Sequence, residues 1–232
     1  MVPRRKVAAV VKRIALGNLA TDQMDEPVTE LVISSGALAF RPIGTFLMAI
    51  LGFAALTEVY NSGSASRWAL DDTAILDAHA CGVRLEVAPA LLAASMTSNG
   101  WPERISFRSA LLPPLDGPPQ LKLGALEHFL FGLSQALLTS FYEDHRKSVE
   151  DVHGKYPAQW PPAWSFGRVV RNALSHGGRL DIRGPLRVSW KQLSYTQADY
   201  GRRIVNSDLW PGDLVILLTE MEAQLPSVAR TS

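Results

Sequence analysis

The sequence predicts a mainly α-helical protein, a helical bundle with one small β-hairpin. Residues 121–150 repeat apolar side chains at three- and four-residue steps, which is the spacing of a buried helix face. Residues 164–178 repeat that spacing and end in two glycines, which favours a helix terminated by a left-handed cap. Residues 179–190 alternate apolar and polar side chains around Gly184-Pro185, which is typical of a β-hairpin.

The composition is that of a globular chain. Of its 232 residues, 47% are hydrophobic and 19% are charged, and the formal net charge is +1. We therefore predict a single domain over residues 1–232, with an N-terminal helical part (1–112), a proline-rich connection (113–120) and a motif-bearing part (121–226). The single cysteine, Cys81, excludes an intrachain disulfide and a cysteine-based metal cluster, and the cytoplasm is the natural compartment.

The N-terminal part is expected to be helical for most of its length. Residues 2–20 predict a basic first helix, and residues 21–42 have a mixed pattern in which Asp22, Asp25, Glu26 and Pro27 mark a loop. Residues 43–59 form the most apolar stretch; because Arg41 and Glu58 bracket it, it is too short to span a membrane, and we expect a buried core helix. Asp71 and Asp72 favour a helix that continues to Cys81. Residues 83–87 predict a short strand, and residues 89–96 predict another helix.

Prolines separate this part from the longest predicted helix. Residues 101–120 are rich in proline, with two proline pairs at 113–114 and 118–119, and predict a connection without an element of its own. The helix over 121–150 has an apolar seam and a polar C-terminal half, in which Glu143, His145 and Arg146 are candidates to line a cleft. Residues 213–225 predict the final helix, again with an apolar face.

The helix over 164–176 has a polar face that suits phosphodiester chemistry. Arg168, Arg171, Asn172, Ser175 and His176 lie on it. A guanidinium binds phosphate oxygens, and an imidazole transfers protons near neutral pH. Arg171 and His176 lie about 140° apart around the helix axis, so one helix directs them apart, whereas two helices crossing about a two-fold axis would bring both sets together.

The segment Arg171-Asn-Ala-Leu-Ser-His176 resembles the Arg-x4-6-His motif of HEPN domains. The sequence downstream, with His-Gly-Gly, Trp190-Lys191, Tyr195, Asp199, Gly201 and Gly212-Asp213-Leu214, is similar to a bacterial and plasmid-borne branch of that family, and the resemblance covers roughly residues 120–226. It implies a HEPN-like helical bundle with the hairpin inserted after the motif helix. It also implies a homodimeric, cytoplasmic, metal-independent endoribonuclease without a cofactor.

The resemblance assigns a role to each candidate residue. His176 would move the proton of the RNA 2′-hydroxyl or of the leaving 5′-oxygen, Arg171 would stabilise charge on the phosphate, and Asn172 would orient His176 or a phosphate oxygen. Between residues 166 and 203 there are eight basic and two acidic side chains, a local excess that an RNA-binding cleft needs. The RNA-binding candidates are Arg168, Ser175, Arg179, Arg183 and Arg187.

Other interpretations stay open. The same pattern fits a solvated helix face with a capping histidine, and Arg146 with His153 forms a second match to the motif. The chain would then be a catalytically silent RNA-binding or protein-interaction module. A toxin–antitoxin or phage-defence component with a partner protein is a further alternative, and a membrane-associated helical protein is the last one. The sequence contains no phosphate-binding glycine loop and no His-Glu-x-x-His zinc motif.

Overall fold

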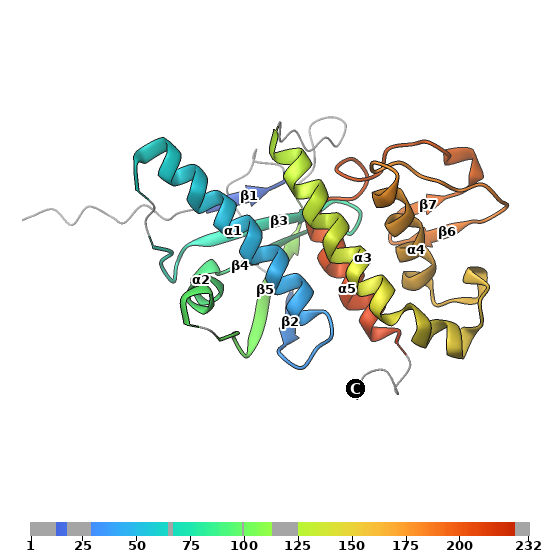
Figure 1. Ribbon diagram of the computed structural model, residues 1–232, viewed down its shortest axis with the longest axis horizontal. Helices are drawn as coiled ribbons and strands as arrows, with labels where there is room; N and C mark the ends of the chain where they lie inside the picture. Colours follow the sequence, from blue (N-terminus) through green and yellow to red (C-terminus); the bar gives the residue numbers. More distant parts are fainter. Residues whose placement is uncertain (1–12, 18–28, 65–66, 99, 113–124, 226–232) are drawn as a thin grey trace, which may run out of the picture.

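A computed structural model of the chain describes residues 13–17, 29–64, 67–98, 100–112 and 125–225 (Figure 1). Five strands form a mixed sheet: β1 (Arg13–Leu16), β2 (Thr29–Ser34), β3 (Thr73–Ala78), β4 (Val83–Val87) and β5 (Arg104–Leu111). Their order across the sheet is β1-β3-β4-β5-β2. β1 runs parallel to β3, and the other neighbouring pairs are antiparallel.

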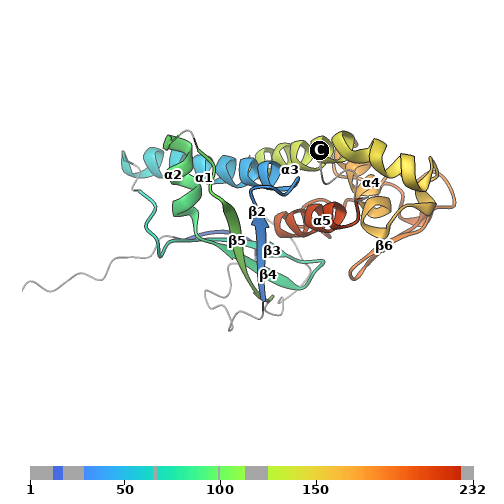
Figure 2. The same ribbon diagram turned by 90° about the horizontal axis from the view of Figure 1, so that it is seen from below.

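The described residues also form five α-helices and a separate hairpin. The helices are α1 (Phe40–Ser62), α2 (Pro89–Ser98), α3 (Ala125–His153), α4 (Pro162–Ser175) and α5 (Pro211–Ala223). The hairpin pairs β6 (Val188–Trp190) with β7 (Leu193–Tyr195). Figure 2 shows α1, α2 and α3 in a layer on one side of the large sheet, with α5 between α3 and the sheet. α4 and the hairpin lie beside α3 and α5, beyond the edge of the sheet.

The prediction of a mainly α-helical, HEPN-like bundle is wrong: the described chain is an α/β protein with a five-stranded mixed sheet. β3 was predicted as a helix because it lacks the period-two alternation of a half-exposed strand. Five of its six residues are buried, so both of its faces are covered. β5 does alternate, but it lies in the stretch that its prolines marked as a connection.

Two further predictions in the N-terminal part need correction. Residues 13–16 form strand β1 and not a turn of the predicted first helix, because they pair with residues 73–76 of β3. The sequence predicted no strand at residues 29–34, which form β2 because they pair with β5 along their whole length. In both cases the partner strand is more than 50 residues away along the chain, where local propensity carries no information. Residues 1–12, 18–28 and the connection 113–120 lie outside the described residues.

The remaining element predictions are largely confirmed. β4, α2, α3, α4 and α5 lie where the sequence places them, within a few residues at each end. The predicted hairpin around Gly184-Pro185 is wrong, because residues 180–187 form no strand. A different hairpin follows them, in which residues 188–190 pair with 193–195 and Lys191 and Gln192 form the turn. Lys191 takes the left-handed backbone conformation, with φ at 50°, that a tight hairpin turn needs.

Helix α1 differs from the predicted core helix in length and burial. It is 23 residues long, and its buried side chains all lie in its first half: Phe40, Ile43, Phe46, Leu47, Ile50 and Leu51. Its second half exposes Leu56, Val59 and Tyr60. Among the described residues, α1 is the one helix that is long and apolar enough to cross a membrane by length and composition, a property that core helices of soluble proteins share.

An ion pair is buried within the sheet. Asp77 of β3 faces Arg84 of β4, and the guanidinium donates from Nε at 2.6 Å and from Nη2 at 3.0 Å to the two carboxylate oxygens. The side chains are 0% and 2% exposed. This bidentate geometry fixes the register of β3 against β4, because a slip of one residue would leave both charges buried and unpaired.

Both ends of α5 bind the sheet-containing part through carboxylates. Asp213 accepts hydrogen bonds from the backbone N–H groups of Ala80 at 3.2 Å and Cys81 at 3.0 Å, in the turn between β3 and β4. It also accepts one from Trp210 at 2.8 Å, which caps the N-terminus of α5 itself. Gly212 allows this approach, because a Cβ there would lie 2.8 Å from the backbone carbonyl of Asp77.

The C-terminal end of α5 caps another helix. Glu222 accepts from the backbone N–H of Leu38 at 2.8 Å and from that of Ala39 at 3.0 Å, directly before α1. These N–H groups have no partner within α1, so the carboxylate satisfies donors at the positive end of the helix. The two carboxylates therefore fix α5 between the β3–β4 turn and the start of α1.

Because the carboxyl group of Asp213 is buried, we expect the free energy of unfolding to depend on pH. Burial raises its pKa from 3.8 to about 6. The folded state then holds the proton more tightly than the unfolded chain. The contribution of this group to the free energy of unfolding is therefore greatest below about pH 4 and decreases by roughly 3 kcal/mol as the pH rises through 6. We expect Asp213→Asn to lower the free energy of unfolding and to remove this slope, measured by urea denaturation between about pH 4 and 7.

Asp71→Asn is the matched control, because Asp71 is an exposed carboxylate outside this contact. It should keep the slope of the wild type. Equal slopes in the wild type and in Asp213→Asn would contradict the assignment.

Candidate functional site

Helix α4 holds the predicted motif and is fixed by its apolar face. Trp164 donates from Nε1 to the backbone carbonyl of Met221 in α5 at 2.8 Å. A Cβ at Gly167 would lie 2.6 Å from the Met221 sulfur, so α4 and α5 approach as closely as a glycine allows. The buried face that this contact creates consists of Ala163, Trp164, Phe166, Val169, Val170, Ala173 and Leu174. The opposite, polar face of α4 is consequently directed away from α5.

His176 lies at the C-terminal end of this helix. Its backbone N–H still donates to the carbonyl oxygens of Asn172 at 3.1 Å and Ala173 at 2.9 Å. Gly177 and Gly178 then take positive φ values of 65° and 81°, which ends the helix as the sequence predicts. The imidazole is therefore placed on a turn whose backbone is fixed on both sides.

The imidazole of His176 faces a carboxylate. Its Nε2 lies 3.2 Å from Oδ2 of Asp181, and the histidine side chain is 51% exposed. Arg183 donates from Nε to the other oxygen of Asp181 at 2.7 Å. This hydrogen bond raises the pKa of Arg183 above its usual value. Asp181 thus orients a histidine and an arginine from one position.

These side chains border a cavity of about 630 Å³, which we call the His176 cavity. Four of the residues predicted from the sequence line it together, namely Arg168, Asn172, His176 and Arg183. Asp181 and Tyr156 line it as well, and they were not predicted. A cavity of this size with converging cationic and proton-transferring groups suits a small anionic ligand or one or two units of a polyanion.

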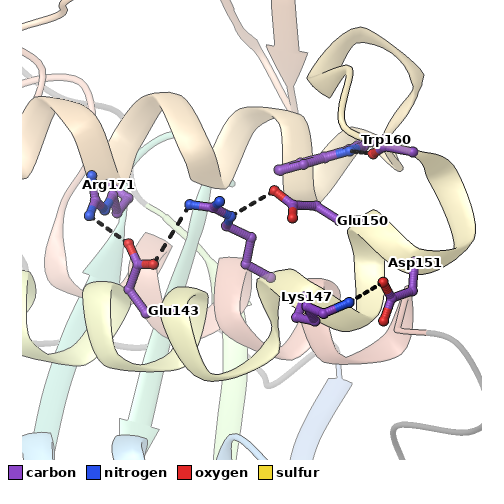
Figure 3. A network of polar contacts seen from close by, with 8 residues as sticks. Glu143, Lys147, Glu150, Asp151, Trp160 and Arg171 are labelled. Carbon is purple, nitrogen blue, oxygen red and sulfur yellow. Dashed lines mark hydrogen bonds and ion pairs between the residues drawn. The ribbon is translucent and has the colours of Figure 1, made fainter.

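Arg171 points to a different neighbour. Its Nη2 lies 2.5 Å from Oε1 of Glu143 on α3, and the other oxygen of Glu143 lies 4.0 Å from Nη1 of Arg146. Arg146 in turn donates from Nε to Glu150 at 2.7 Å. Figure 3 shows this row of alternating charges along the boundary between α3 and α4. Arg171 does not line the His176 cavity.

The guanidinium of Arg171 is partly enclosed. Its Nη1 donates to Oδ1 of Asn172 at 3.3 Å, and its Nε is buried without a hydrogen-bond partner. It also lies 6.0 Å from the centre of the Tyr142 ring, whose burial raises the pKa of Tyr142 to about 12. Asn172 therefore contacts Arg171 and also lines the His176 cavity.

The three remaining predicted residues lie outside the His176 cavity. Ser175 donates its hydroxyl to the backbone carbonyl of Arg171 at 3.2 Å. Arg179 donates to the carbonyl of Gly201 at 3.0 Å. Arg187 is exposed and donates from Nε to Ser194 at 3.3 Å. In one chain, therefore, the structure divides the predicted site into a cavity group and several side chains that point elsewhere.

The alternative chemistries find less support. Arg146, the first residue of the second motif match, is held by Glu150 and Glu143 on its own helix. Burial and the neighbouring Asp213 raise the pKa of the Cys81 thiol, which disfavours a nucleophilic thiolate. Among the described residues, no group of three His, Cys, Asp or Glu side chains is placed to hold a metal ion.

Comparison with known proteins identifies no relative. No protein-family model, no curated protein and no solved structure matches this chain.

Asp181 and Tyr156 are the cavity residues that sequence reasoning missed. Asp181 was assigned to a strand of the predicted hairpin, where it would share a face with Arg179 and Arg183 and not turn towards the end of the motif helix. Residues 180–187 form no strand, so Asp181 turns back towards His176 instead. An acidic side chain five positions after a helix-ending histidine was the available signal. Tyr156 gave none, because it is brought in by the turn between α3 and α4.

In the turn after His176, we expect alanine substitutions at the two neighbouring glycines to lower the free energy of unfolding by different amounts. Gly177→Ala meets open space and should cost about 1 kcal/mol, the penalty of a left-handed residue. Gly178→Ala should cost at least about 1 kcal/mol more, because its Cβ would also lie 3.2 Å from Phe131 and 3.3 Å from Val205. Urea denaturation of both variants measures the difference.

Gly132→Ala, in the exposed interior of α3, is the control with the opposite sign. Its Cβ meets nothing within 4 Å, so it should stabilise the protein by roughly 0.5 kcal/mol. Equal losses for Gly177→Ala and Gly178→Ala would contradict the packing of Phe131 against this turn.

Proposed function

We propose that this protein is a metal-independent endoribonuclease that cleaves RNA in the His176 cavity by attack of the 2′-hydroxyl on the neighbouring phosphate. One observation carries the proposal: an imidazole paired with a carboxylate shares a cavity of about 630 Å³ with the side chains of two arginines and an asparagine. Proton transfer and phosphate binding are the two requirements of this reaction.

The pairing of His176 with Asp181 supports a defined role for each ring nitrogen. Nε2 lies next to the carboxylate, so it holds a proton there, and Nδ1 is left to exchange a proton with the substrate. In the reaction the 2′-oxygen forms a bond to phosphorus, and the bond between phosphorus and the 5′-oxygen breaks. Either Nδ1 accepts the proton of the 2′-hydroxyl and water protonates the leaving 5′-oxygen, or a protonated His176 gives its proton to the 5′-oxygen and water accepts the one from the 2′-hydroxyl. The products are a 2′,3′-cyclic phosphate and a 5′-hydroxyl. Asp181 stabilises the imidazolium, as the carboxylate does in a catalytic triad.

Arg168 is the better placed phosphate-binding residue within one chain. It lines the His176 cavity, and no described carboxylate forms an ion pair with it. Arg183 is held by Asp181, so its remaining N–H groups can contact a second oxygen. The role that the sequence assigns to Arg171 requires a second copy of α4 in a homodimer, because Arg171 does not line the His176 cavity of its own chain.

The proposal rests on α4 and its cavity and not on the overall fold. Resemblance to the HEPN motif supports it through Arg171, Asn172 and His176 only, since the sheet is not part of a helical bundle. The cytoplasmic location, the homodimer and a partner protein from a toxin–antitoxin or phage-defence system stay predictions. A catalytically silent RNA-binding or protein-interaction module is the competing function, and the same experiment separates the two.

The decisive test is cleavage of an RNA pool in EDTA. We expect the wild type to cut RNA but not DNA, which lacks the 2′-hydroxyl, and His176→Ala to lose roughly a hundredfold or more of the rate. His153→Ala is the matched control, because His153 belongs to the second motif match at the end of α3, and it should retain full activity.

Each alternative outcome has a clear meaning. RNA binding without cleavage by the wild type would favour the silent binding module. Equal cleavage by the wild type and His176→Ala, or cleavage of DNA, would contradict the mechanism. Loss of activity in His153→Ala alone would move the site to Arg146 and His153.

Asp181 should act through the imidazole. We expect Asp181→Asn to lower kcat by at least about tenfold with a smaller change in KM, because the imidazolium loses its partner while Arg168 still binds phosphate. Arg183→Gln separates the two functions of Asp181, since it removes the other contact of this carboxylate and should mainly raise KM. Steady-state kinetics on a short RNA measures both, and an unchanged kcat in Asp181→Asn would contradict the role.

A further inference from the structure

A second cavity lies on the other side of the turn that ends α4. It has a volume of about 290 Å³ and is lined by Glu127, His128, Phe131, Gly177, Arg179 and Arg203. We propose that this Arg203 cavity is a subsite for an adjacent nucleotide of a single-stranded RNA whose scissile phosphate lies at His176. The inference rests on the proposed function, and it adds a binding site that the reaction itself does not require.

The two cavities share one wall. His176 lines the first cavity and Gly177 lines the second, and these residues are consecutive. Their Cα atoms are about 3.8 Å apart, as in any trans peptide. A nucleotide chain that leaves the His176 cavity therefore has to cross only this single turn. The backbone there is held by the hydrogen bond from the N–H of Gly178 to the carbonyl of Ala173 at 2.8 Å.

The charges in the Arg203 cavity are not balanced. Arg179 and Arg203 are paired across an antiparallel bridge, which places two positive side chains next to each other. Like charges at such a position repel unless an anion lies between them. Glu127 forms an ion pair with Arg203, whereas Arg179 donates to the carbonyl of Gly201 and pairs with no carboxylate among the described residues. The pair therefore retains one uncompensated positive charge, which a phosphate group would neutralise with bidentate hydrogen bonds.

An aromatic side chain completes the subsite. Phe131 of α3 lines the cavity and lies so near the turn that a Cβ at Gly178 would be 3.2 Å from its ring. Aromatic rings beside cationic grooves bind the bases of single strands by stacking, without sequence preference. The cavity volume suits one nucleotide and not a duplex, in which the bases are covered by pairing. These features favour a single-stranded RNA over a protein partner.

The test uses binding of oligouridylates with 2′-O-methyl groups, which 2′-hydroxyl attack cannot cut. We expect Arg179→Gln to weaken octanucleotide binding several-fold and to reduce the slope of log affinity against log salt by about 0.7, the value for one lost phosphate contact on a single strand. Binding of a dinucleotide, which the His176 cavity alone can hold, should not change. Glu127→Gln should raise octanucleotide affinity, because it removes the carboxylate that competes for Arg203.

Arg104→Gln is the matched control, because Arg104 is exposed on β5 of the sheet and its loss changes the net charge equally. It should leave both affinities unchanged. Wild-type salt slopes and octanucleotide affinities in Arg179→Gln and Glu127→Gln would overturn the subsite while leaving the proposed function intact. Tight octanucleotide binding that depends on Arg179, in a protein that does not cut RNA, would support the subsite and reject the nuclease. No RNA binding by the wild type would overturn both.

Discussion

The structure depends on the way in which α5 is held between two distant backbones. Asp213 at its start binds the N–H groups of the β3–β4 turn, and Glu222 in its last turn caps α1. Between them, Met221 offers its carbonyl oxygen to Trp164 of α4, and Glu220 accepts the indole N–H of Trp190 at 2.6 Å. α5 is thus the element against which the sheet, the motif helix and the hairpin are all positioned. The place of the His176 cavity follows from these contacts.

Elements stabilised by contacts within their own sequence could be predicted, and elements stabilised by distant parts of the chain could not. Helices α3, α4 and α5 have their own signals, namely apolar faces at helical spacing and, at the end of α4, the glycines after His176. The strands of the large sheet have no comparable signals. β3 is buried on both faces and therefore lacks alternation, and β1 and β2 become strands only through partners far along the chain. Their formation is a tertiary effect that propensity cannot anticipate.

The candidate site divides in the same way. The helical spacing of Arg168, Asn172 and His176 sufficed to place them together. Arg171 is taken by Glu143, a contact between two helices that no local pattern encodes. Several residues of the family-like pattern have structural roles instead: Tyr195 donates its hydroxyl to Asp208 at 2.9 Å, and Asp199 completes a capping box with Thr196. The residues of a motif resemblance therefore include some that form a cavity and others that stabilise the structure around it.

The contacts of α5 also constrain the order of folding during synthesis. Asp213 lies 133 positions after Ala80, and Glu222 lies 184 positions after Leu38. Until the last helix has left the ribosome, the β3–β4 turn and the start of α1 lack the carboxylates that satisfy them. Such contacts of high sequence separation slow folding and make it cooperative, because the entropy of closing a long loop is lost before the contact is gained. The N-terminal sheet therefore reaches its final structure only after translation of the complete helical part.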